Sequence, residues 1–407
     1  KIPIFFIGLF VLLKMEGLKL NKKNIYLMYL IIFLQSLVFY GSIATLYRQK
    51  RGLSMTEIFI IESAYFIIVI ILEVPWGKLA DKIGYKKIVV IANFIYFLSK
   101  IVFYNSGSFL GFLIERIFLA AALAGLSGCD SAYLYNSIYD KSLCDKVFSK
   151  YNFYTTLGFL LASLSSVFII EISMESTVLF TIVAYGIAFI LSLFLDEVPK
   201  DEKNASIKMN FKETFNNKNI IVFIISITLF SEIVQGITVY LNQNKYISCG
   251  IDVKKFGIIL ALSQIISLIT GKSYYFKRIL GERKYINILY LIILVATLIL
   301  WRTTSAVVSV ISVMSISLSD ALFAPIVMEI ENKSVTTGER ATILSIYSVI
   351  GSVVSAAINP LIGLVADYSL GTSFLLCSML CVIAFIAMNC YLVKEDSKMK
   401  LCNEKRI

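Results

Sequence analysis

The chain has 407 residues, of which 58% are apolar and only 16% are charged, and its mean hydropathy is +0.81. This composition excludes a water-soluble globular protein and indicates that most of the chain lies in lipid. The net charge of +11 does not indicate nucleic-acid binding, because the basic residues form short clusters between apolar runs. There is no histidine, so protonation chemistry near neutral pH would use carboxylates.

The apolar runs predict membrane helices. Residues 2–13 form a run that is too short to span a bilayer, which needs about 20 residues, and we expect an interfacial segment or an upstream extension, with Met15 the natural start. Twelve longer runs follow, and helices are expected because only helices satisfy every backbone group of an open chain in lipid. These runs are 24–47, 55–76, 88–104, 108–135, 149–170, 174–195, 219–244, 254–276, 285–301, 305–330, 341–366 and 371–393.

The distribution of lysine and arginine predicts the orientation of the chain. Most of the 38 basic residues lie in one of the two sets of loops, together with both polar ends, which predicts that both termini are cytoplasmic. The cluster Arg48–Arg51 departs from this bias. Six runs lie on each side of a polar connector, which predicts two related bundles. The predicted units are a cytoplasmic segment 1–23, bundles 24–195 and 219–393, the cytoplasmic linker 196–218 and a cytoplasmic tail 394–407.

A polar stretch, Glu73–Lys87, joins the second and third runs. Pro75 disfavours helical geometry in the residue before it and can kink the end of the segment. Gly77 and Gly84 allow close backbone approach and a positive φ. The stretch is therefore predicted to form a tight, charged hairpin, and a weakly similar turn, Gly281–Lys284, recurs in the second half.

This hairpin resembles the loop signature between the second and third helices of the major facilitator superfamily (MFS), and its Glu-x-Pro-x-Gly beginning is similar to bacterial drug-efflux-type members. Tyr85 stands where the family usually has Arg or Lys. Ser127–Ser137 and Glu339–Ser345 resemble further motifs of that group, in the fourth and eleventh helices. The resemblance implies an all-α membrane protein with twelve transmembrane helices in two pseudo-symmetric six-helix bundles.

The resemblance also implies a gating role for the hairpin and for one aspartate of the fourth helix, in a charge cluster that steadies the outward-open state. The alternative for this aspartate is an ordinary interfacial residue. The residues assigned to the gating motif are Gly77, Asp81, Lys82, Gly84, Lys86 and Asp130.

Charged side chains within the runs are functional candidates, because each costs at least about 2.5–3.5 kcal/mol at mid-membrane. Arg116 resembles the fourth-helix arginine associated with proton coupling in the family, and an internal ion pair is its alternative role. Glu232 has no basic residue within two turns and is the best lone candidate for a protonatable carboxylate. The proton-coupling candidates are Glu62, Glu115, Arg116, Glu232 and Asp320. The substrate-cavity candidates are Gln35, Tyr40, Gln235, Gln264 and Asn359.

These features predict a secondary active transporter that moves a small hydrophobic or amphipathic solute across the cell membrane by alternating access. Proton-coupled efflux is the leading direction, from the resemblance. An importer or facilitator of a small metabolite is the first alternative, and a non-transporting membrane sensor is an alternative of another class. The sequence contains no catalytic or metal-ligand constellation, so we expect no enzyme, cofactor or metal. The expected partners are the solute, protons and the lipid bilayer, without nucleic acid, and the chain is expected to be a monomer.

Overall fold

The computed structural model describes residues 21–198, 218–334 and 340–404, and its regular elements in these ranges are helices. The expected all-α membrane fold is confirmed for this part of the chain. The predicted segment 1–23 lies almost entirely outside the described residues, as do most of the linker 196–218 and Glu339 of the eleventh-helix motif.

The helices form two halves. The N-terminal half contains α2 (Lys22–Gln35), α3 (Ala44–Lys50), α4 (Met55–Ile83), α5 (Tyr85–Asn105), α6 (Phe109–Leu126), α7 (Cys129–Asn136), α8 (Cys144–Ile172) and α9 (Met174–Leu193). The C-terminal half contains α11 (Lys218–Gln235), α12 (Asn242–Ser248), α13 (Phe256–Ser267), α14 (Ser273–Leu280), α15 (Glu282–Arg302), α16 (Ala306–Ser334), α17 (Arg340–Tyr368) and α18 (Leu370–Glu404).

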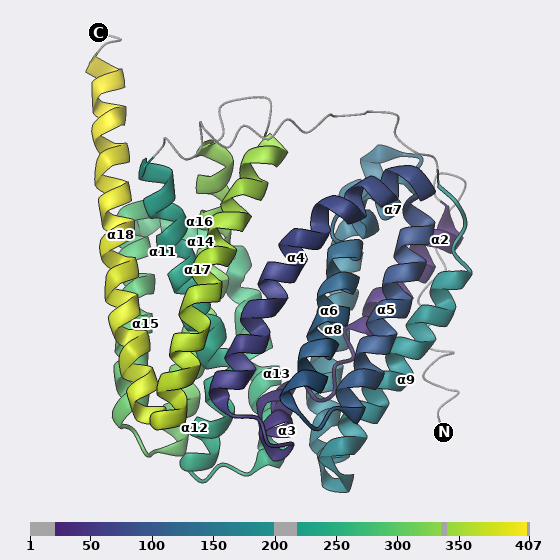
Figure 1. Cartoon of the computed structure of the whole chain (residues 1–407). Coiled ribbons are helices and arrows are strands. Elements are labelled where there is room, and N and C mark those ends of the chain that lie inside the picture. Colours follow the sequence, from purple (N-terminus) through teal and green to yellow (C-terminus); the bar gives the residue numbers. More distant parts are fainter. Residues whose placement is uncertain (1–20, 199–217, 335–339, 405–407) are drawn as a thin grey trace.

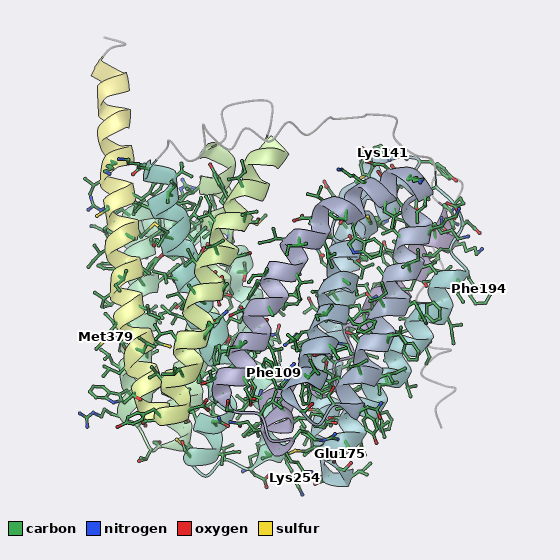
Figure 2. The ribbon with its side chains drawn as sticks, in the orientation of Figure 1. Phe109, Lys141, Glu175, Phe194, Lys254 and Met379 are labelled. Atoms are coloured by element: carbon green, nitrogen blue, oxygen red, sulfur yellow. The ribbon has the colours of Figure 1, made fainter. Side chains whose placement is uncertain are left out.

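Figure 1 shows that α4 and α17, one from each half, lie side by side at one end of the molecule and diverge toward the other. We call the end at which α9 finishes and α11 begins the connector end, and the opposite end the distal end. Lys141 lies at the connector end, whereas Glu175 and Lys254 lie at the distal end (Figure 2). The two halves therefore meet mainly at the distal end.

Close backbone approach holds the halves together there. A Cβ atom on Gly363 of α17 would lie 2.8 Å from the Cα of Thr56 in α4, so only glycine fits at this distance. Gly257, at the start of α13, packs in the same way against the backbone oxygen of Ser163 in α8. Phe59 of α4 is completely buried in an apolar cluster drawn from both halves.

Hydrogen bonds also cross this distal contact. The Asp367 carboxylate, near the end of α17, accepts bonds from the backbone N–H groups of Met55 (2.7 Å) and Thr56 (2.8 Å) at the start of α4. Gln243 of α12 accepts bonds through Oε1 from the backbone N–H groups of Thr45 and Leu46 in α3, at 3.0 and 3.1 Å. Each side chain thus satisfies helix N-terminal donors of the opposite half.

Eleven helices of the described part are long and apolar enough to cross a membrane, and the first predicted run is not among them. Instead of one helix over 24–47, the chain breaks between α2 and α3. The exposed backbone groups of this break find partners on α9: Phe39 donates to Thr181 Oγ1 at 3.1 Å, and the Tyr185 hydroxyl donates to the Gln35 carbonyl. Irregular backbone is tolerated at membrane depth when protein satisfies it in this way.

The predicted hairpin over Glu73–Lys87 is much shorter than expected. Helix α4 continues through Pro75 to Ile83, and Gly84 alone, with φ +94°, separates it from α5. Helical geometry before Pro75 is therefore retained, at the cost of one backbone hydrogen bond. In the second half, Gly281 (φ +78°) separates α14 from α15 in the same way.

Candidate functional site

A cavity of about 370 Å³ lies between the two halves. One wall comes from the broken first span, α6 and α8, and the other from residues 238–246, α13 and α16. The hydrogen-bonding side chains on the walls are Tyr40, Ser42, Arg48, Arg116, Thr238, Tyr240, Asn242, Gln243, Tyr246, Ser263, Gln264, Ser267 and Ser317. Apolar side chains complete it, among them Val38, Phe159, Phe256, Ile259, Leu260 and Val313. The cavity therefore offers both polar and apolar contacts to a small molecule.

Two ion pairs stand beside this cavity in the N-terminal half. Arg116 of α6 contacts Glu62 of α4, with 2.9 Å between Nη2 and Oε2. The adjacent Glu115 points to a different partner, Arg48 of α3, at 3.8 Å. All four side chains are largely withdrawn from solvent, and a weaker approach of 3.9 Å between Arg116 Nε and Glu115 Oε2 joins the pairs. Opposite charges compensate one another here, as charges within a membrane require.

The Glu62 carboxylate also reaches the second half, because Gln235 of α11 donates to its Oε1 at 3.3 Å. Directly after Gln235 the chain forms a π-helical segment, Gly236–Leu241, before α12 begins. Such segments are frequent at functional sites. This one carries Tyr240 into the cavity wall. The structure thus brings three predicted candidates, Arg116, Glu62 and Gln235, into one chain of contacts across the two halves.

Glu232 lies one turn before Gln235 on α11 and has no cationic partner among the described residues. Its Oε1 accepts a hydrogen bond from Ser355 of α17 at 2.6 Å. The other oxygen, Oε2, is buried without a hydrogen-bond partner, and so is the amide nitrogen of the neighbouring Asn359. A buried carboxylate in this setting can hold a proton and donate it to another acceptor.

The remaining candidates fall at different places. Two of the substrate-cavity candidates, Tyr40 and Gln264, line the central cavity. Gln35 lines a separate cavity of about 290 Å³ within the N-terminal half, where its Nε2 donates to Asn93 at 2.7 Å. Asp320 is half-buried on α16 and makes no hydrogen bond or ion pair within the described part of the chain.

The gating-motif residues gather at the connector end. Ala80, Ile88 and Cys129 form a small buried cluster that joins the end of α4 to the starts of α5 and α7. Beside it, Asp130 accepts hydrogen bonds from its neighbour Ser131 and, at 3.1 Å, from the Tyr151 hydroxyl of α8. A Cβ atom on Gly77 would meet no atom within 4 Å, so this glycine makes no close approach in this conformation.

The corresponding turn of the second half holds an ion-pair network. Lys277 of α14 contacts Glu282 of α15 at 2.8 Å and Glu329 of α16 at 2.7 Å. Burial alone would lower the pKa of Lys277, but the hydrogen bonds to these two carboxylates outweigh it and raise that pKa. The network ties the turn around Gly281 to the end of α16.

Sequence reasoning missed three buried cations, Arg48, Lys100 and Lys245. Arg48 is buried and paired with Glu115, and Arg51 of the same cluster donates to the Tyr104 and Ser106 carbonyls. The sequence feature that could have indicated this burial is the departure of the cluster Arg48–Arg51 from the distribution of basic residues in the loops. Lys100 of α5 is also buried, and its position inside the apolar run 88–104 could have indicated this from the sequence.

Two halves of membrane-length helices around a partly polar cavity define a helical membrane transport protein. Among the described residues, no group of three or more cysteine or acidic side chains could hold a metal ion. The family model of the Major Facilitator Superfamily matches residues 25–360, and the chain belongs to this family. It is therefore a secondary transporter and not an enzyme.

The relatives support the family and the fold. An uncharacterized MFS-type transporter of Methanocaldococcus jannaschii is 28% identical over 140 residues, which are 34% of this chain and 36% of that protein. The match thus spans about a third of the relative's length.

Solved structures resemble most of the chain. A variant of the nucleoside transporter NupG has a TM-score of 0.79 at 16% identity, covering 90% of this chain and 99% of that one. A bacterial homolog of the human lysosomal transporter Spinster, in an inward-facing conformation, has a TM-score of 0.71 at 15% identity, covering 92% and 98%. A D-xylose–proton symporter has a TM-score of 0.68 at 13% identity, covering 90% and 96%. At these identities the likeness establishes the MFS fold alone.

Proposed function

We propose that this protein is a proton-coupled transporter of a small amphipathic organic solute that works by alternating access. The central cavity supports this proposal, because its hydrogen-bonding side chains face apolar ones such as Phe159 and Phe256. A solute with a polar head and an apolar body would satisfy both kinds of contact. Of the two kinds of solute expected from the sequence, hydrophobic or amphipathic, the cavity favours the amphipathic one, since a wholly apolar compound would leave the polar wall unpaired.

Glu232 carries the proposal of proton coupling. Its carboxylate is buried and lacks a cation, and Ser355 of another helix holds one oxygen at 2.6 Å. Protonation removes the cost of burying a charge, so a change in water access to this side chain changes its proton occupancy. Glu62 and Arg116 would sense the same change, because Gln235 joins this pair to α11, the helix that carries Glu232.

The cytoplasmic orientation of the termini remains a proposal drawn from the basic loops. With the connector end in the cytoplasm of a plasma-membrane protein, the distal contact closes the outer side, and this conformation faces inward. The gating motif, with Asp81, Lys82, Lys86 and Asp130, would then assemble at the inner side when the halves close there. Asp320 and Glu115 are secondary candidates for the coupling, and we propose that the chain acts as a monomer.

The two directions of transport remain separate candidates. Export is favoured by the efflux-type resemblance of the hairpin and of Ser127–Ser137. Uptake of a polar metabolite is favoured by the hydrogen-bonding wall of the cavity, and nucleosides and D-xylose are among the solutes named for proteins of similar fold. A non-transporting sensor is the candidate of another class.

A direct test is solute-driven proton movement in liposomes that contain the purified protein and a trapped pH-sensitive dye. The added panel would comprise nucleosides, pentoses, dipeptides, and lipophilic amines and carboxylates. A solute that enters with protons acidifies the lumen, whereas a solute exchanged for protons makes it alkaline, so the sign distinguishes symport from antiport.

Empty liposomes and the Glu232→Gln variant are the controls. Proton movement that requires both protein and solute supports the proposal. Solute flux of equal size with no proton movement would show a facilitator, and the absence of both flux and counterflow across the panel would favour the sensor.

A further inference from the structure

Lys100 occupies an unusual position for a charged residue. It lies within α5, is only 3% exposed, and forms no ion pair with any acidic residue of the described chain. Its ammonium nitrogen lies 4.8 Å from the ring centre of Tyr96, 5.1 Å from that of Tyr185 and 5.8 Å from that of Tyr40. Aromatic faces stabilise a cation at such distances, most strongly where water is excluded.

Other buried cations of the protein have stronger partners. Arg48 and Arg116 face carboxylates, and Lys245 donates at 2.6 Å to the carbonyl of Thr303, which follows the C-terminus of α15. Lys100 has one hydrogen bond, to the neutral Tyr40 hydroxyl at 3.2 Å. Its charge is therefore not compensated within the described protein, although compensation is the rule for membrane-buried charges.

Tyr40 connects this lysine to the central cavity, because it both accepts the bond from Lys100 and lines the cavity wall. A phenolic oxygen that accepts from an ammonium group keeps its own hydrogen for another acceptor. No described side chain or backbone group accepts that hydrogen. The Tyr40 hydroxyl therefore has a hydrogen that it can donate in a hydrogen bond to a molecule in the cavity.

The charges on the surrounding helices do not cancel. The N-terminal half contributes Arg48, Lys100 and Arg116 on α3, α5 and α6, against the carboxylates of Glu62 and Glu115 on α4 and α6. One positive charge is left over on this side of the cavity. Because water is largely excluded here, an uncompensated charge acts on a ligand in the cavity strongly enough to select the sign of the ligand's charge.

From this geometry we infer that the transported solute carries an anionic oxygen, such as a carboxylate, which accepts the hydrogen bond of Tyr40. Lys100 is the positioning residue that orients the Tyr40 hydroxyl and supplies the unbalanced charge. This inference rests on the proposed function and names its solute class. It makes α5 a determinant of specificity although α5 contributes no side chain to the cavity wall itself.

The effect of the Lys100 charge on molecules in the cavity can be measured without knowing the solute. Gly41→Cys places a thiol on the cavity wall next to Tyr40, where a Cβ atom meets nothing closer than 3.9 Å. In a background without native cysteines, the thiol is labelled with an anionic and a cationic methanethiosulfonate of similar size. We expect the anionic reagent to be favoured relative to a free thiol, and Lys100→Gln to reduce this preference about three- to tenfold.

Lys87→Gln is the matched control, because it removes an exposed lysine from the same helix. It should leave the labelling ratio unchanged. Equal ratios in the parent and in Lys100→Gln, with both proteins eluting as folded species, would overturn the inference. A second thiol at Ser317, on the opposite wall, keeps the test valid if the first variant fails to fold.

The charge that the protein prefers in a ligand is tested separately by thermal unfolding with benzoate, benzamide and benzylamine, which share a ring and differ in charge. Benzoate should stabilise the protein most, and Lys100→Gln should abolish its advantage over benzamide. Greater stabilisation by benzylamine would contradict an anionic solute. Both measurements are made without transport, so a failure of this inference can be distinguished from a failure of the proposed function in the liposome test.

Discussion

The Oδ2 atom of Asp367 accepts two hydrogen bonds from Thr56, one from its backbone N–H at 2.8 Å and one from its hydroxyl at 2.6 Å. The first residue belongs to α17 and the second to α4, so this carboxylate joins the halves at the N-terminus of a helix. A negative charge is stabilised at that position by the unpaired N–H groups and the helix dipole. Alternating access requires that these bonds break whenever the distal end opens.

Asp367→Asn should therefore shift the population toward conformations that are open at the distal end. Losing charge-assisted bonds to the α4 N-terminus costs about 1–2 kcal/mol, a shift of about 5- to 30-fold. The measurement is the labelling rate of a cysteine placed at the distal mouth of the cavity. Glu171→Gln is the matched control, since its exposed pair with Lys254 also crosses the halves but contributes little. An unchanged rate in Asp367→Asn would show that the bond does not hold the contact.

The tight glycine at the same contact gives a second prediction. Gly363→Ala places a methyl group 2.8 Å from the Thr56 Cα and 2.9 Å from the Met55 oxygen, which the present conformation cannot accommodate. We expect the same shift in labelling as for Asp367→Asn. Gly77→Ala, on the exposed side of α4, meets no atom within 4 Å and should not disturb this conformation. Identical labelling of the two alanine variants would contradict the role assigned to the close approach.

Glu232→Gln should uncouple solute movement from the proton gradient. Glutamine retains an oxygen that can accept from Ser355 but cannot exchange a proton. The variant is expected to keep solute counterflow and to lose accumulation driven by a pH gradient. Glu232→Asp retains a carboxylate and should keep part of the coupling. Normal gradient-driven accumulation by the glutamine variant would move the coupling role to another carboxylate, such as Glu62.

The buried ion pair of Arg116 and Glu62 predicts a specific pattern of stability. Removing either partner leaves an uncompensated buried charge, so Arg116→Gln or Glu62→Gln alone should each destabilise the protein by about 3–5 kcal/mol. The double variant should recover much of this loss, because both charges are gone. Thermal unfolding of the purified protein measures the pattern. Lys23→Gln breaks the exposed pair with Asp196 and should change stability by less than about 1 kcal/mol. If the loss of stability in the double variant equals the sum of the two single losses, the two buried charges do not stabilise each other.

Much of the fold could be predicted because lipid imposes strong constraints on the sequence. Apolar length and the cost of unpaired backbone groups identify most membrane helices. The break in the first span could not be found in this way, because the groups that satisfy it, Thr181 and Tyr185, lie on α9, far along the chain. Pro75 was misleading for a related reason: a proline predicts a helix end locally, whereas α4 continues past it.

The candidate site was partly predictable. Glu62, Arg116 and Glu232 stand out as charges inside apolar runs, which is a local property of the sequence. Their partners Ser355 and Gln235 do not stand out in the sequence, because only the fold places these two common polar residues beside a carboxylate. Lys100 also stands inside an apolar run, but the three tyrosines around it come from the break after α2, from α5 and from α9, and only the fold brings them together.

The bond between Gln243 and the amides of Thr45 and Leu46 has a consequence for the opening of the distal end. When α12 withdraws, two backbone donors of the short helix α3 lose their acceptor at once. Water entering from the distal end, or a polar group of the solute, must then replace the lost oxygen. We therefore expect the first turn of α3 to become hydrated, or to bind solute, whenever the distal end opens.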